Sequence, residues 1–217
     1  MYVVVVIATK GGVGKSTISV NLASVAAQRG MRVLLNDCDL QKSSADWRDV
    51  RQADDIVASV TTTPTIHKDL PKYKESFDIA IVDCGGETIS PILASAMGSA
   101  NDNGIIIIPV LPSVYDIWAT SDTIKVLRQV RGIQDVEARF LMNQVIPNRI
   151  MGKEILKELD KYKDEVEVLT NKLYFRESFK KTIAEGKGVV ESDDAKTKRE
   201  MNAVFDEILE ILKSKEK

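Results

Sequence analysis

The sequence is poor in the residues that build disulfide frameworks and transition-metal sites. Its 217 residues include two cysteines and one histidine. Two cysteines make no disulfide framework. Because Cys38 and Cys84 each adjoin an aspartate at a predicted strand end, we interpret them as small buried residues rather than redox centres. His67 lies in a polar connection without companion ligands, which argues against a metal site and predicts a surface side chain.

The chain also lacks long apolar runs and a strong charge bias. No run approaches the roughly 20 residues that span a bilayer, and the N-terminus shows no basic region or cleavage site, so we expect a cytoplasmic protein. A formal net charge of −2 provides no overall attraction to nucleic acid, so any DNA contact requires a local basic patch. Without repeats or long linkers, residues 1–217 are expected to form a single domain.

Strand and helix signals alternate along the chain. The predicted strands are Tyr2–Ala8, Met31–Asn36, Ile56–Val60, Asp78–Val82, Ile105–Val110, Ala138–Met142 and Val166–Leu169. The predicted helices are Lys15–Arg29, Ser43–Ala53, Ser90–Ala100, Tyr115–Arg131, Met151–Lys163, Phe175–Glu185 and Ala195–Lys213. Strands separated by helix-length segments imply right-handed crossovers. We therefore predict an α/β fold with a doubly wound, mostly parallel sheet flanked by helices, and ligands at the carboxyl ends of its strands.

A glycine-rich segment follows the first predicted strand directly. It reads KGGVGKST, from Lys10 to Thr17. Its three glycines allow backbone N–H groups to surround phosphate oxygens at a helix N-terminus. In this pattern Lys15 supplies a point charge for the β- and γ-phosphates, and Ser16 places its hydroxyl on Mg²⁺. Thr9 replaces the first glycine of the ordinary phosphate-loop pattern, and Lys10 is an additional cation at the mouth of the site.

This motif, with its leading lysine, resembles the deviant Walker A motif of the ParA/MinD family of dimerising ATPases. The resemblance implies a P-loop NTPase fold of the SIMIBI type, ATP and Mg²⁺ as ligands, and slow ATP hydrolysis. It also implies that Lys10 reaches across a two-fold axis to the nucleotide of the partner subunit. Nucleotide contacts are then expected from Lys10, Gly11, Gly12, Val13, Gly14, Lys15, Ser16 and Thr17, with Lys10 and Lys15 taking part in catalysis.

The segment after the second predicted strand is similar to the D-x-D-P-Q segment of the family. It reads Asp37-Cys38-Asp39-Leu40-Gln41. By resemblance, Asp37 organises the Mg²⁺ environment and Asp39 polarises the attacking water. Leu40 stands where the family has proline, so no ring fixes φ in this turn. From the residues alone, the two aspartates could equally cap a helix or stabilise a turn.

The predicted strand Asp78–Val82 leads into Asp83 and resembles Walker B. Mg²⁺ keeps several waters and takes few direct carboxylates, so Asp83 is expected to hold the ion through a coordinated water. Gly85 and Gly86 follow, and would let the backbone approach the γ-phosphate and change conformation on hydrolysis. An apolar strand that ends in aspartate is common, so this match counts only in combination with the phosphate loop.

Two further strand ends carry weaker signals. The segment Ile108–Asp116 resembles the I-P-V-x-P-S loop that lies near the dimer interface in relatives, although Pro109 and Pro112 equally mark the exit of a strand. Asp116 is expected to cap the following helix or to contact a lysine of the partner subunit. Asn143 resembles an asparagine that some relatives place against adenine, and a turn asparagine is the alternative.

The C-terminal third indicates a subfamily. Residues 136–141, 175–176 and 185–192 resemble the short, ParF-like ParA proteins of plasmid partition, and the resemblance covers essentially the whole chain. Because the phosphate loop begins almost at the first residue, no operator-binding helix-turn-helix is expected before it. The resemblance implies a nucleoid-associated ATPase for DNA partition, a homodimer with ATP that binds non-specific DNA. Its hydrolysis would be stimulated by a small ParB- or ParG-like centromere-binding adaptor.

The helix near residues 174–184 is predicted to carry the DNA contacts. Its apolar positions recur every four residues and are expected to face the core: Phe175, Phe179 and Ile183. Arg176 and Lys180 then share a neighbouring face, with Lys181 close by, and form a candidate phosphate-contacting patch. A solvated helix face is the alternative interpretation.

Two other functions remain open at this point. A MinD-like positioning ATPase would bind membranes through its last helix, which has an apolar stripe of Val204, Phe205, Ile208, Leu209 and Leu212. The polar face carries Asp206, Glu207 and Glu210, which anionic lipid repels. We therefore expect this helix to dock on its own domain, and no membrane partner. A ParA-like ATPase that positions a non-DNA cargo is the third candidate, and the sequence does not separate it from plasmid partition.

Overall fold

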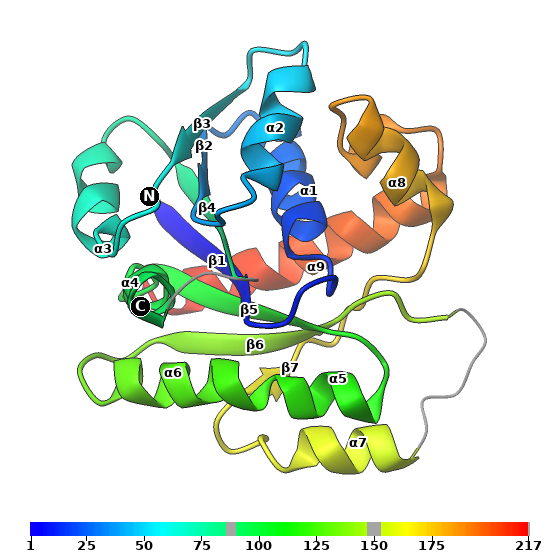
Figure 1. Cartoon of the computed structure of the whole chain (residues 1–217). Helices are drawn as coiled ribbons and strands as arrows, with labels where there is room; N and C mark the ends of the chain where they lie inside the picture. The colour runs from blue at the N-terminus through cyan, green and yellow to red at the C-terminus, as the bar shows by residue number, and fades with distance from the viewer. Residues whose placement is uncertain (86–89, 147–152, 217) are drawn as a thin grey trace.

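The computed structural model describes residues 1–85, 90–146 and 153–216. Within them a seven-stranded sheet has the order β3-β2-β4-β1-β5-β6-β7, and every neighbouring pair is parallel. The strands are β1 Tyr2–Ala8, β2 Val33–Asp37, β3 Ile56–Val60, β4 Ile79–Gly85, β5 Gly104–Val110, β6 Glu137–Met142 and β7 Glu167–Val168. The prediction of a doubly wound, parallel α/β sheet is confirmed (Figure 1).

Helices cover both faces of the sheet. The α-helices are α1 Lys15–Gln28, α2 Ser43–Val50, α3 Ile66–Asp69, α4 Ser90–Gly98, α5 Val114–Ala119, α6 Ser121–Arg131, α7 Lys153–Asp160, α8 Glu177–Ala184 and α9 Ala195–Ser214. Two short 3₁₀ turns, η1 Leu70–Tyr73 and η2 Val189–Glu191, complete the described elements. Figure 1 shows α5, α6 and α7 along one side of the sheet and α1, α8 and α9 on the other.

The core consists of two apolar layers separated by the sheet. Along β1, Val3, Val5 and Ile7 face a layer built with α4, α6 and α7, whereas Val4 and Val6 face a layer built with α1, α2 and α9. Successive side chains of a strand point to opposite faces. A strand buried on both faces therefore reads as one continuous apolar run, which is why the sequence predicts β1 correctly.

The long helix predicted for residues 115–131 is interrupted at Thr120. The Thr120 side chain donates from Oγ1 to the carbonyl oxygen of Ile117 at 2.6 Å, and its backbone N–H donates to the same oxygen at 3.0 Å. A hydroxyl that bonds the preceding turn competes with the regular helical ladder. The segment therefore forms two helices, α5 and α6.

The prediction for the segment around α8 was wrong at its start. Phe175 lies before the helix in an extended segment, where its backbone N–H donates to the carbonyl oxygen of Val145 at 2.9 Å. It is 47% exposed, whereas Phe179 is buried. The strand-like pairing takes residues 174 and 175 out of the helical repeat, so the predicted i, i+4, i+8 stripe does not exist. Helices α3 and η1 were not predicted, although Ile66 and Leu70 are buried in them.

Candidate phosphate-binding site

The phosphate loop turns sharply between β1 and α1. Gly12 and Gly14 have φ values of 77° and 92°, a region that glycine enters at no steric cost. Helix α1 begins at Lys15, and no side chain caps its N-terminus. Its first N–H groups and its positive dipole end are therefore available to an anion. Lys15 is 7% exposed, with Nζ 3.4 Å from the carbonyl oxygen of Lys10.

Two contacts from distant elements hold this loop in place. The Thr9 backbone N–H donates to Thr123 Oγ1 of α6 at 3.2 Å. The Asn143 amide, just after β6, donates from Nδ2 to the carbonyl oxygen of Val13 at 2.8 Å. A Cβ added at Gly14 would lie 2.4 Å from that same Nδ2. The loop therefore needs glycine at 14, and Asn143 supports the phosphate loop directly, a contact that sequence reasoning missed.

Asp37 fixes the loop that presents Asp39. Its Oδ1 accepts the Asp39 N–H at 2.9 Å, and its Oδ2 accepts the Ser44 N–H at 2.9 Å, the Ser44 hydroxyl at 2.7 Å and the Ala45 N–H at 3.0 Å. The carboxylate thus anchors both the turn and the N-terminus of α2. These bonds fix both ends of the segment that contains Leu40, which has no proline ring to restrain its φ.

Asp39 lies at the mouth of the site. Its Oδ1 accepts the Gln41 N–H at 3.1 Å, and its side chain lines the same cavity of about 490 Å³ as Lys15 and Ser16. The residues that line this cavity are Thr9, Gly11, Gly12, Gly14, Lys15, Ser16, Thr17, Asp39, Gln41, Ser43 and Gln144. The structure therefore brings the predicted phosphate loop and the predicted water-polarising carboxylate together.

Asp83 is a buried acid at the back of the site. It pairs in register with Asp37 of β2 and Val6 of β1, and is 0% exposed. Neither carboxylate oxygen has a hydrogen-bond partner in the described part of the chain. Burial raises the pKa of Asp83 to about 7, the Asp37 charge adds to the rise, and Ser16, Ser44 and Lys15 oppose it. A fully buried carboxylate without a partner is costly.

Gly85 brings β4 against the phosphate loop. Its φ is 145°, and an added Cβ would lie 2.1 Å from the Ala8 carbonyl oxygen and 2.7 Å from Cδ and Cε of Lys15. Only glycine fits there, because the backbone passes close to Ala8 and Lys15. The predicted approach of Gly85 to the γ-phosphate remains a prediction. The prediction for Gly86 lies outside the described residues.

Lys10 is outside the cavity that its own loop forms. Its Nζ donates to Asp116 Oδ1 of α5 in the same chain. The predicted helix cap at Asp116 was wrong, since Ser113 occupies the N-cap position of α5. The other prediction for Asp116, a lysine of the partner subunit, involves a second copy and remains a prediction. Tyr115 and Trp118 flank the ion pair, are largely exposed, and contact each other edge to face at 5.6 Å between ring centroids.

A profile of the CobQ/CobB/MinD/ParA nucleotide binding domain matches residues 4–190. This chain belongs to the ParA/MinD family. The Halothiobacillus neapolitanus "Maintenance of carboxysome distribution protein A" is 29% identical over 208 residues, covering 92% of this chain and 93% of that protein. "Protein ParA" of Rhizobium radiobacter is 28% identical over 131 residues, covering 59% of this chain and 57% of that protein.

The solved structures show the same fold. Apo McdA of Cyanothece matches with a TM-score of 0.77 at 14% identity, covering 95% of this chain and 99% of that chain. A variant of that McdA in complex with ATP matches with a TM-score of 0.75 at 14% identity, covering 95% of this chain and 96% of that chain. Together with the profile, these matches confirm the predicted family and the predicted P-loop fold.

The donor set of this ParA/MinD site fits Mg²⁺. In the described residues no cluster of three or more histidine, cysteine or acidic side chains is arranged to hold a metal ion. Mg²⁺ needs no such cage, since it binds through one or two carboxylates together with phosphate oxygens and water. The unpartnered Asp83 carboxylate beside the Ser16 hydroxyl offers those protein oxygens. Asp37 would act through water, because its oxygens are occupied by backbone and hydroxyl donors.

A smaller cavity of about 140 Å³ adjoins the phosphate site. Gly14, Thr17 and Gln144 line both cavities. The smaller one adds the amide of Asn143, the two cations Arg176 and Lys180, and the aromatic or apolar groups of Tyr174, Phe175, Phe179 and Ile183. A slot lined by aromatic side chains, an amide and two cations suits the purine base of a nucleotide. Phe175 is exposed, which contradicts its predicted core position, and its side chain lines this slot instead.

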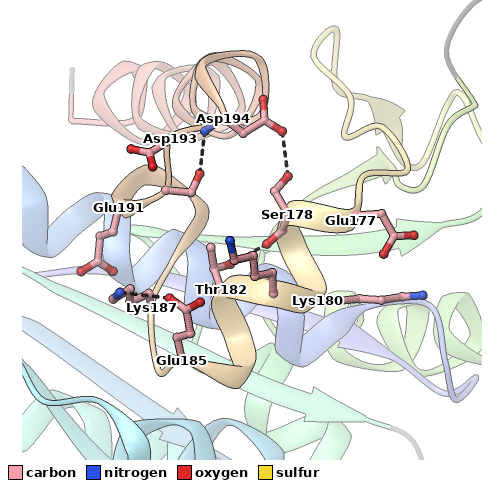
Figure 2. A pocket seen from close by; sticks show the side chains of 11 residues that line it. Glu177, Ser178, Lys180, Thr182, Glu185, Lys187, Glu191, Asp193 and Asp194 are labelled. Carbon is pink, nitrogen blue, oxygen red and sulfur yellow. Dashed lines mark hydrogen bonds and ion pairs between the residues drawn. The ribbon is translucent and has the colours of Figure 1, made fainter.

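The predicted DNA-contacting residues are spread over several hollows, although Arg176 and Lys180 line the smaller cavity together. Arg176 precedes α8 and forms an ion pair with Glu200 of α9. Lys180 and Lys181 line a cavity of about 700 Å³ between α8 and the start of α9. Figure 2 shows that this cavity is also lined by Glu177, Glu185, Glu191 and Asp193, so its charge is mixed. A more basic hollow, of about 460 Å³, is lined by Lys172, Arg176, Lys196 and Arg199 together with Glu200.

The structure also bears on the expectations for membrane-spanning helices, the single histidine and the two cysteines. No helix in residues 1–85, 90–146 and 153–216 is long and apolar enough to cross a membrane. His67 is exposed, as predicted, and its Nδ1 lies 2.8 Å from Ser95 Oγ. Cys38 and Cys84 are both buried, which agrees with their interpretation as small core residues.

Proposed function

We propose that this protein is a ParA-type ATPase for DNA partition, which dimerises on ATP, binds non-specific DNA in that state and is released by hydrolysis. The observation that carries the proposal is the combination of an uncapped, glycine-rich α1 N-terminus with the buried, unpartnered Asp83 carboxylate behind it. The open helix N-terminus favours binding of an anion, and the buried carboxylate favours binding of a cation. Mg²⁺-ATP supplies both at once, with Ser16 and Asp83 on the metal side.

The chain's own residues suit slow phosphoryl transfer. Lys15 lies beneath the loop, where its charge would neutralise the β- and γ-phosphates. Asp39 faces the same cavity and, because Asp37 anchors its loop, would orient a water for in-line attack. This reaction depends on positioning and charge neutralisation more than on a strong base. A low basal rate that a partner protein increases is therefore part of the proposal.

Lys10 accounts for dimerisation in this scheme. The phosphate cavity has Lys15, and Lys10 lies outside it on Asp116. The Lys10 side chain of this pair is 41% exposed and that of Asp116 is 12% exposed, and pairs that reach solvent contribute only about 0–1 kcal/mol. Lys10 can therefore leave Asp116 at little cost and serve the nucleotide of a second copy. Hydrolysis would remove the phosphate that holds this bridge.

DNA binding is assigned to the basic hollow rather than to α8 alone. Lys172, Lys196 and Arg199 line it together with Arg176, whose charge Glu200 balances. Lys180 and Lys181 remain candidates as exposed cations nearby. Phosphate contacts of this kind carry no sequence information, and a dimer would present two such surfaces to one duplex.

A second candidate is supported by one comparison. The match to the Halothiobacillus relative covers 93% of that protein, whose name refers to carboxysome distribution. The same ATP-gated switch could position a protein assembly instead of a plasmid. Deleting the gene in its host separates the two, because plasmid loss among daughter cells indicates partition and clustering of an assembly indicates positioning.

The nucleotide switch is tested with Lys15→Ala and Asp39→Ala. We expect wild type to sediment as a dimer with Mg²⁺-ATP and as a monomer with Mg²⁺-ADP. Lys15→Ala should not bind ATP or dimerise, and Asp39→Ala should dimerise but hydrolyse ATP poorly. Lys68→Ala, at an exposed position of α3, is the matched control and should behave as wild type. A Lys15→Ala protein that dimerises with ATP would remove the phosphate-site assignment.

A further inference from the structure

We infer that Gln144 binds the ribose of the nucleotide and is a nucleotide-positioning residue of this site. The inference rests on the proposed nucleotide binding. Gln144 follows Asn143 at the carboxyl end of β6, and no motif in the sequence marks it. Three observations support the role: its position between two cavities, its backbone conformation and its unoccupied carboxamide.

Gln144 lies at the junction of the two cavities described above. Gly14, Thr17 and Gln144 line both the larger, phosphate-binding cavity and the smaller, aromatic one. If the triphosphate occupies the first and the base the second, the sugar that joins them passes this junction. A methyl group added at Gly14 would lie 3.9 Å from Gln144 Nε2, so the carboxamide lies beside the end of the phosphate loop.

The backbone of Gln144 is held in an unfavourable conformation. Its φ is 53°, and among the described non-glycine residues only Lys42 shares a positive φ. The neighbours on both sides are fixed, since the Asn143 N–H donates to Val110 O at 2.9 Å and the Val145 N–H donates to Leu173 O at 3.0 Å. Non-glycine residues in this region usually mark a functional constraint, because the surrounding structure must compensate for the strain.

The carboxamide of Gln144 has no hydrogen-bond partner among residues 1–85, 90–146 and 153–216. Its side chain is half-buried at the cavity junction. A carboxamide offers both an acceptor oxygen and donor N–H groups. The two hydroxyls of a ribose need the same pair of functions, whereas a bare polyphosphate offers acceptors only. The carboxamide therefore matches a sugar better than it matches the phosphate chain.

The test compares Gln144→Ala and Gln144→Gly in the full chain with Mg²⁺. Dissociation constants are measured for ATP, 2′,3′-dideoxy-ATP and inorganic tripolyphosphate. Wild type should bind dideoxy-ATP about fivefold to tenfold more weakly than ATP, the loss typical of one neutral hydrogen bond. Both variants should bind ATP as weakly as wild type binds dideoxy-ATP, without further discrimination between the two. Tripolyphosphate should bind equally to all three proteins.

The alanine and glycine pair separates the side chain from the backbone. Gln144→Ala should unfold at a lower urea concentration than Gln144→Gly, because alanine tolerates a positive φ less well. Nucleotide affinity should nevertheless be equal in the two. Lys42→Ala and Lys42→Gly are the matched control, since Lys42 has the same φ but lines neither cavity. They should show the same order of unfolding while keeping the wild-type preference for ATP over dideoxy-ATP.

Three results would overturn the inference. The variants could keep the wild-type ratio of ATP to dideoxy-ATP affinity, tripolyphosphate affinity could fall as much as ATP affinity, or Gln144→Gly could bind ATP as wild type does. The last result would place the effect in the backbone alone. If wild type itself binds neither ATP nor tripolyphosphate, the proposed function fails, and that outcome is distinct from all three.

Discussion

At the residue scale, Asp83 has the least favourable surroundings for its own charge. It is fully buried, unpartnered among the described residues and next to Asp37 in register. A protein that keeps such a group spends stability on it, because the charged form is poorly solvated. The arrangement is reasonable for a site that receives a cation together with its nucleotide.

Asp83 should make the stability of the nucleotide-free protein depend on pH. Its folded pKa, raised by burial to about 7, exceeds the value of 3.8 of a free aspartate. A raised folded pKa contributes stability that is complete below the unfolded pKa and is lost as pH rises through the folded value. Relative to Asp83→Asn, wild type should therefore lose roughly 3 kcal/mol of unfolding free energy between pH 5 and pH 8. Urea unfolding without Mg²⁺ or nucleotide measures this change.

Asp78→Asn is the control for this measurement. Asp78 is paired with Arg32, which lowers the pKa of Asp78 to about 2. It is therefore charged at both pH 5 and pH 8, and the stability difference from wild type should not change between them. A pH-independent difference for Asp83→Asn as well would mean that Asp83 does not carry a buried charge.

Lys10 and Asp116 provide a second prediction at this scale. Asp116 holds Lys10 within its own chain, so it competes with any nucleotide of a partner subunit. Asp116→Asn should lower the concentration needed for ATP-dependent dimerisation by about threefold, in line with the small free energy of an exposed ion pair. Lys10→Ala should bind ATP but fail to dimerise. Analytical ultracentrifugation with Mg²⁺ and a slowly hydrolysed ATP analogue measures both, and weaker dimerisation of Asp116→Asn would contradict this role.

At the scale of elements, helix ends connect the site to the rest of the fold. The N-terminus of α1 is left open for a ligand, and that of α2 is capped by Asp37. The N-terminus of α9 is capped by Asp194, whose carboxylate accepts the Lys196 and Thr197 N–H groups. Figure 2 shows the same carboxylate bonded to Ser178 at the start of α8. One aspartate thus joins the two helices that flank the mixed-charge cavity.

Asp194→Ala should destabilise the protein by about 1–2 kcal/mol, the usual cost of losing an N-cap. Hydrogen bonds from Thr197 lower the pKa of Asp194 to about 2. A lowered folded pKa contributes stability that is present above the unfolded pKa, 3.8, and is lost as pH falls through the folded value. The difference between wild type and variant should therefore shrink as pH falls from 5 toward 2. Asp193→Ala, at the exposed neighbour, should leave the urea midpoint unchanged.

At the scale of the whole molecule, the sheet separates two layers of helices. Helices α1, α2, α8 and α9 share one apolar layer, so the phosphate loop, the aromatic cavity and the basic hollow belong to the same side. The apolar residues of α9 are part of that layer, with Val204, Phe205, Ile208 and Leu212 at 0% exposure. This helix is already docked on its own domain, so we expect no ATP-dependent sedimentation with anionic vesicles.

DNA binding offers the corresponding positive prediction. Replacing Lys172, Lys196 and Arg199 together with alanine should weaken ATP-dependent binding to non-specific duplex DNA. Each lost phosphate contact should reduce the slope of log affinity against log salt by about 0.9. Lys213→Ala, at the far end of α9, should leave that slope unchanged, and Arg176→Ala should change it little because Glu200 already balances its charge. A triple variant with the wild-type slope would place the DNA surface elsewhere.

Much of the fold could be read from local patterns. Strand β1 has the bounds that its apolar run predicts, and Asp37, Asp39 and Asp83 lie around the phosphate loop as expected. The prediction errors occur where a polar or aromatic residue can adopt more than one local conformation or hydrogen-bonding pattern. Thr120 interrupts a helix because its hydroxyl bonds the preceding turn, and Phe175 leaves a helical repeat because its backbone pairs with residue 145.

The sequence by itself determined the parallel sheet, the phosphate loop and the acids at the strand ends. These features depend on continuous apolar runs, which mark strands buried on both faces, and on short motifs, which act over a few positions. Only the tertiary structure decided that Asn143 supports Val13, that Lys10 rests on Asp116 and that Gln144 lies between two cavities. The first two contacts join residues more than a hundred positions apart. The position of Gln144 depends on a strained backbone conformation that the packed fold imposes. Their geometry exists only after the helices have packed on the sheet.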